Sequence, residues 1–205
     1  MSGPLVAALV ALGLGVVAVR RRSAAIVLVT AQSLLLGAGA LSLAAGHSAE
    51  LLVAGCVLIA KAGAVPALLI WTLHRTREPQ LVAAAWPAFV RVLGGAVTAL
   101  AVSATMPSLG LESEAAERGA LALVAIGIFV VVSRKPVLFQ AIGLLVAENG
   151  IYLLALSAPG GMPFVIELGV LFDLMLVLTV AIGFTHRIHA ELGTGDTEQL
   201  RGLRD

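Results

Sequence analysis

The chain has 205 residues, of which 60% are hydrophobic and only 12% are charged. Soluble domains carry roughly a quarter charged residues, so this chain cannot cover its apolar surface in one water-exposed globule. The composition therefore predicts an all-α, polytopic membrane protein. The formal net charge of +1 gives no reason to expect nucleic acid as a partner. The single cysteine, Cys56, excludes an intrachain disulfide and a multi-cysteine metal or iron–sulfur site.

Apolar runs of suitable length predict about seven transmembrane helices, at about 20 residues for each span. The predicted spans are Pro4–Val19, Ala24–Ala45, Leu51–Leu73, Ala88–Ala104, Gly119–Ser133, Val137–Leu156 and Pro163–Phe184. Most connections between them contain Gly or Pro, which end helices and favour turns. The first and fifth runs are short, so we expect these helices either to tilt little or to be extended by neighbouring residues.

The basic residues predict the orientation, because Lys and Arg near span ends accumulate on the cytoplasmic side. Arg118 lies in the loops of one side, and Lys61 lies within a span. All other basic residues lie towards the opposite side: Arg20, Arg21, Arg22, Arg75, Arg77, Arg91, Arg134, Lys135, Arg187, Arg201 and Arg204. The N-terminal residues lack the basic region of a cleavable signal peptide. We therefore predict an outside N-terminus and a cytoplasmic C-terminus.

The chain also contains a candidate internal repeat. Residues 9–20 and 123–134 are identical at seven of twelve aligned positions, and Gln32-Ser33 then aligns with Glu148-Asn149. This pattern predicts two parallel three-helix repeats, as some transporters have. The predicted parts are a first repeat over residues 1–78, a connecting segment with the fourth helix over 79–117, a second repeat over 118–190 and a cytoplasmic tail over 191–205. Chance similarity between chains rich in Ala, Leu, Val and Gly is the alternative.

Four ionisable side chains fall within the predicted spans. Lys61, Glu148 and Asp173 share a depth of roughly 12–15 Å below the outer surface, at 1.5 Å of rise per residue. Glu167 lies higher, about one helical turn inside its span. The short connection at residues 158–162 predicts that the sixth and seventh helices are antiparallel neighbours, which would bring Glu148 and Asp173 within reach of each other. Ionisable residues inside a membrane are costly and are candidates for function.

Proton handling is the chemistry that such residues favour. Burial and a nearby lysine act in opposite directions on the protonation of a carboxyl group, so a carboxyl between the two influences can bind and release a proton. Asn149 and Gln32 are candidate supporting polar residues. A fixed buried ion pair, or protonated carboxyls that only hydrogen-bond neighbouring helices, is the alternative. His186 and His189 lack further ligands for a metal site, and no known catalytic motif is present, so we expect no cofactor and no active site.

Several motifs resemble component E of hydrogenase-4-type complexes. They are Glu148-Asn149-Gly150, Ile166–Asp173, the Lys61–Pro66 stretch and the tail Gly195–Arg204. The three C-terminal predicted helices are similar to the small K-type subunit of complex I and to the C-type component of cation/proton antiporters that are built from several subunits. In the K-type subunit two helix-borne glutamates lie on the ion path, and Glu148 and Glu167 would be their counterparts.

The resemblance implies a non-catalytic membrane-arm subunit of a prokaryotic inner-membrane complex, beside large antiporter-like subunits. Such a complex couples electron transfer to movement of H⁺ or Na⁺, and its membrane subunit has no small-molecule substrate of its own. Service in a cation/proton antiporter of several subunits is an alternative. A stand-alone secondary transporter is a further one, disfavoured because broken helices are absent near the centres of both repeats. The last alternative is a purely structural spacer.

Overall fold

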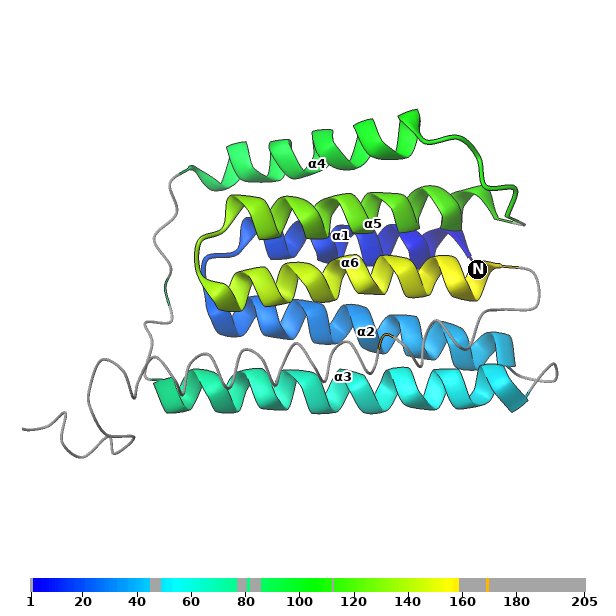
Figure 1. Ribbon diagram of the computed structural model, residues 1–205, viewed down its shortest axis with the longest axis horizontal. Coiled ribbons are helices and arrows are strands. Elements are labelled where there is room, and N and C mark those ends of the chain that lie inside the picture. Colours follow the sequence, from blue (N-terminus) through cyan, green and yellow to red (C-terminus); the bar gives the residue numbers. More distant parts are fainter. Residues whose placement is uncertain are drawn as a thin grey trace, which may run out of the picture.

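The computed structural model describes residues 2–44, 49–76, 81, 86–111, 113–158 and 169. This part of the chain is all-helical, with one isolated backbone bridge between Arg21 and Leu81 and no strand. Its helices are α1 (Gly3–Ala18), α2 (Arg22–Ala44), α3 (Ala49–Thr76), α4 (Ala88–Thr105), α5 (Glu114–Ser133) and α6 (Val137–Ser157). They lie side by side along one long axis, and consecutive helices run in opposite directions (Figure 1).

Five of these helices, α2 to α6, are long and apolar enough to cross a membrane. The remaining helix, α1, is apolar but has only 16 residues. Each of the first six predicted spans corresponds to one helix, so the prediction of an all-α protein with several apolar helices is confirmed. The predicted seventh span, Pro163–Phe184, lies outside the described residues except for Gly169, which is helical. The tail over residues 191–205 also lies outside them.

Helix α5 begins five residues before the predicted Gly119, and the reason is a polar N-terminal cap. The Ser113 hydroxyl accepts a hydrogen bond from the Ala116 backbone N–H at 3.3 Å. Glu114 and Glu117 in the first turn place negative charge at the positive end of the helix dipole. The expected extension of the fifth helix by neighbouring residues is therefore confirmed.

The core lies among α1, α2, α5 and α6, with α3 packed on α2, and α4 on α5 and α1. Helices α5 and α6 approach closely at two glycines: a Cβ on Gly127 would lie 2.5 Å from both the Gly143 carbonyl oxygen and the Ala147 nitrogen. Small residues allow such close contact between helices in membranes, where van der Waals packing stabilises the assembly. Helix α6, which carries Glu148, is thereby held in the centre of the bundle.

Helix α3 contains Pro66 within its 28 residues and still continues as one helix. Proline has no N–H, so it cannot donate to the carbonyl of Ala62, four residues earlier. Membrane helices tolerate proline where other groups satisfy the released carbonyl. The consequence is an extra acceptor one residue away from Lys61, near the middle of the span.

Candidate functional site: a buried charge cluster between three helices

The centre of the bundle holds an ion pair between α3 and α6. The Lys61 ammonium Nζ lies 2.8 Å from Glu148 Oε2, and the two residues are only 6% and 7% exposed. Lys61 lies near the middle of α3, and Glu148 lies near the middle of α6. Charges are costly at this depth unless they are paired, so the contact offsets part of the cost of burying these two side chains.

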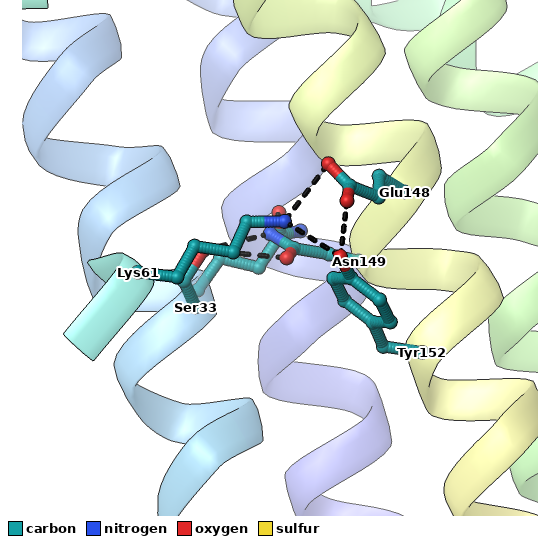
Figure 2. Close-up of polar contacts among 6 residues, drawn as sticks. Ser33, Lys61, Glu148, Asn149 and Tyr152 are labelled. Carbon is teal, nitrogen blue, oxygen red and sulfur yellow. Dashed lines mark hydrogen bonds and ion pairs between the residues drawn. The ribbon is translucent and has the colours of Figure 1, made fainter. Parts of the chain in front are cut away.

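Tyr152 completes the cluster from the next turn of α6. Its hydroxyl donates a hydrogen bond to Glu148 Oε1 and accepts one from Lys61 Nζ at 3.1 Å. The same ammonium lies 4.3 Å from the centroid of the Tyr152 ring, within the range of a cation–π interaction. Figure 2 shows Lys61 reaching across from α3 towards Glu148 and Tyr152, which project from α6. Three titratable groups are thus in direct contact.

A neutral polar network joins α2 to α6 beside this cluster. The Asn149 amide Nδ2 donates to Gln32 Oε1 at 2.9 Å and to Ser33 Oγ at 3.1 Å. Ser33 Oγ donates in turn to Asn149 Oδ1 at 3.2 Å, and Gln32 Nε2 donates to the Leu9 carbonyl of α1 at 2.9 Å. All three side chains are buried. Full satisfaction of these polar groups fixes the depth of α6 relative to α2, and therefore the position of Glu148.

The structure brings together four of the six predicted site residues: Lys61, Glu148, Asn149 and Gln32. Glu167 and Asp173 lie outside the described residues, as do His186 and His189. Sequence reasoning did not assign Tyr152 a role, although its spacing of four residues from Glu148 places both on one helix face. Among the described residues no group of three or more His, Cys, Asp or Glu side chains could hold a metal ion.

The arrangement can store and exchange a proton. Each Glu148 oxygen has its own partner, because Oε1 accepts from the Tyr152 hydroxyl and Oε2 faces the Lys61 ammonium. Separating Lys61 from Glu148 would leave a carboxylate in an apolar interior, where the protonated form is favoured. The protonation of Glu148 is therefore coupled to its distance from Lys61.

Gly169 lies directly against the cluster. A Cβ at this position would overlap the Tyr152 hydroxyl and lie 2.6 Å from Glu148 Oε1. We expect Gly169→Ala to displace Tyr152 or Glu148, at a cost of about 1–3 kcal/mol for overpacking. The measurement is the midpoint of thermal unfolding of the purified protein in detergent, which should fall.

Gly63→Ala is the matched control for this prediction. Gly63 lies in α3, two residues from Lys61, and a Cβ there would meet nothing within 4 Å. Alanine favours a helix over glycine by about 1 kcal/mol, so Gly63→Ala should leave the midpoint unchanged or raise it. Equal midpoints for the two variants would contradict the close contact at Gly169.

These helices and their buried charge cluster define an α-helical membrane protein with a polar centre. No protein-family model and no solved structure matches the chain. It is similar to a curated protein of Mycobacterium tuberculosis (strain ATCC 25618 / H37Rv), "Uncharacterized protein Rv0085". The two are 34% identical over 112 residues, which make up 53% of this chain and 51% of that protein. The chain thus spans about half the length of the relative, whose name states no activity.

Proposed function

We propose that the protein is a non-catalytic membrane-arm subunit of a hydrogenase-4-like or complex I-like assembly. In this role it carries protons, or sodium ions, across part of the membrane while partner subunits transfer electrons. Glu148, Lys61 and Tyr152 form the proton-exchanging cluster, and Glu167 and Asp173 are proposed to extend the path. Large antiporter-like membrane subunits are the proposed partners, in a prokaryotic inner membrane with the N-terminus outside.

The observation that carries the proposal is the pairing of Lys61 with Glu148 near the middle of the membrane span. Apolar side chains could fill this space without the cost of burying two charges, so stability alone does not account for the pair. Ionisable residues that face a bundle interior and pair with one another are typical of proton relays. The resemblance of the Glu148 and Lys61 motifs to component E supports the choice of complex.

Co-purification tests the assignment to a larger membrane complex. An affinity-tagged chain is extracted from native membranes in mild detergent, and the proteins that remain bound are identified by mass spectrometry. We expect large polytopic membrane subunits together with peripheral redox subunits, in stoichiometric amounts. A tagged Gly63→Ala chain is a suitable control, because the substitution meets no neighbouring atom. Recovery of the 20.9 kDa chain alone, with ion transport in liposomes, would instead establish a stand-alone transporter.

A further inference from the structure

The Lys61 ammonium occupies the place that a metal cation bound to Glu148 would need. Its Nζ lies 2.8 Å from Glu148 Oε2 and 3.1 Å from the Tyr152 hydroxyl oxygen, so one positive charge contacts both groups from a point between α3 and α6 (Figure 2). A second cation on Glu148 would lie beside this ammonium, and like charges repel strongly in an apolar interior. The cluster therefore already holds a cation that belongs to the chain.

The side-chain oxygens around the cluster already accept from donors of the chain. Glu148 Oε1 accepts from the Tyr152 hydroxyl. In the neighbouring network, Gln32 Oε1 and Ser33 Oγ accept from Asn149 Nδ2, and Asn149 Oδ1 accepts from Ser33 Oγ. A hard cation such as Na⁺ is held by a shell of several oxygen ligands. These oxygens could join such a shell only by giving up the contacts that hold the helices together.

The backbone of the two helices offers little to a metal ion. Helices α3 and α6 are continuous where they carry Lys61 and Glu148, so their carbonyls accept hydrogen bonds within each helix. Membrane sodium sites are typically built where a helix is interrupted and leaves its carbonyls free. The exception here is the carbonyl of Ala62, which Pro66 releases. One carbonyl does not make a coordination shell.

Within the described part of the chain, the helices packed against α6 add no charge at the depth of Glu148. The charged residues of these two helices, α2 and α5, lie near the helix ends: Arg22, Glu114, Glu117 and Arg118. The described titratable groups that face Glu148 are Lys61 and Tyr152. An ion that Glu148 binds is therefore exchanged beside an ammonium and a phenol.

A proton fits this arrangement without rebuilding it, because it needs one lone pair and no shell of ligands. Its transfer from Lys61 Nζ to the facing Glu148 Oε2 breaks one N–H bond and forms one O–H bond. The products are a neutral amine and a carboxylic acid, and no other reactant is required. We propose that the cluster exchanges protons and excludes sodium ions. This inference rests on the proposed function for its role in transport and names the ion that the cluster carries.

Infrared spectroscopy of the purified full-length protein in detergent tests the selectivity. The band of a protonated carboxyl that is lost in Glu148→Gln and kept in the control Glu117→Gln reports on Glu148. We expect this band to titrate with the same midpoint pH in choline chloride and in sodium chloride. Competition by bound Na⁺ would lower that midpoint by about one pH unit for each tenfold rise in Na⁺ above its dissociation constant. Such a shift, or a Glu148 that does not titrate while the protein stays folded, would overturn the proposal.

Thermal unfolding supplies a second measurement that needs no spectral assignment. The wild-type protein is compared in sodium chloride and in choline chloride at equal concentration and pH, and we expect equal midpoints because no sodium site forms. A rise specific to sodium that Glu148→Gln abolishes and Glu117→Gln retains would overturn the proposal. Should Glu148→Gln not fold, Glu148→Asp keeps a carboxyl group and assigns the infrared band by the change in its frequency.

This inference and the proposed function fail separately. Both measurements use the isolated chain, so they decide the ion whether or not a larger complex forms. Recovery of the chain alone in the co-purification experiment would overturn the assignment to a complex and leave the selectivity of the cluster intact. Competition by sodium at Glu148 would overturn the selectivity and leave the assignment to a complex intact.

Discussion

Glu148→Gln is expected to abolish coupled proton movement while the protein still accumulates in the membrane. Glutamine has nearly the shape of glutamate and keeps an oxygen that can accept from Tyr152 and Lys61, but it cannot bind and release a proton. The cation–π contact with Tyr152 continues to stabilise Lys61. Acidification inside inverted membrane vesicles, followed with a pH-sensitive dye during electron transfer, is the measurement. Unchanged acidification would exclude Glu148 from the ion path.

Glu117→Gln is the control for this experiment. Glu117 is also a buried carboxylate, but it accepts a hydrogen bond from the Leu109 backbone N–H at 2.8 Å, in the first turn of α5. Its place at the end of the bundle gives it no contact with the Lys61–Glu148 pair. Vesicle acidification with the Glu117→Gln variant should equal that of the wild type. A loss of acidification in both Glu117→Gln and Glu148→Gln would indicate general damage to the assembly.

Lys61→Met is expected to have the largest effect on stability. It leaves the Glu148 carboxylate buried without its counter-charge, and breaking a buried ion pair in this way costs about 3–5 kcal/mol. The expected result is a strong fall in the folded fraction, measured by size-exclusion chromatography in detergent and by the thermal midpoint. A midpoint equal to that of the wild type would show that Glu148 is protonated beside a neutral lysine in the resting state.

The double variant Lys61→Met/Glu148→Gln separates the structural role from the ionic one. It removes both charges, so most of the stability lost in Lys61→Met should return, because neutral replacement of a buried pair is often tolerated. The two substitutions should therefore be strongly non-additive, as contacting residues are. The restored protein should still move no protons. Normal proton movement in the double variant would support the structural-spacer alternative.

Much of the fold follows from the sequence because apolar runs report directly on membrane helices. The observed helix boundaries differ from the predicted ones where polar residues extend a helix beyond the hydrocarbon core of the membrane. Helix α3 extends to Ala49 and Thr76, beyond the predicted Leu51 and Leu73. Hydropathy detects only the apolar part of such a helix. The orientation in the membrane and the two-repeat organisation remain predictions.

The candidate site was only partly predictable, because its side chains come from different helices that make contact only in the folded protein. Equal depth placed Lys61 and Glu148 together, because depth follows from counting residues along each helix. Which helices are neighbours does not follow from counting, so the contact of Lys61 in α3 with Tyr152 in α6 is visible only in the structure. The sequence pattern likewise indicates only that Arg91 and Arg134 are charges at span ends. Their burial depends on the C-terminal carbonyls of α1, which are remote in sequence.

The hydrogen bond between Ser33 and Asn149 joins two positions that correspond to each other in the predicted repeat. When two identical protomers associate about a two-fold axis, a residue at the axis meets its own copy. A duplicated gene would inherit that contact within one chain, and its halves could then diverge. On that prediction Gln32 and Glu148 would be such a divergent pair, and the contact of Lys61 with Glu148 would join one half to the other. The charge pair would then be an innovation of the fused protein, unavailable to its symmetric ancestor.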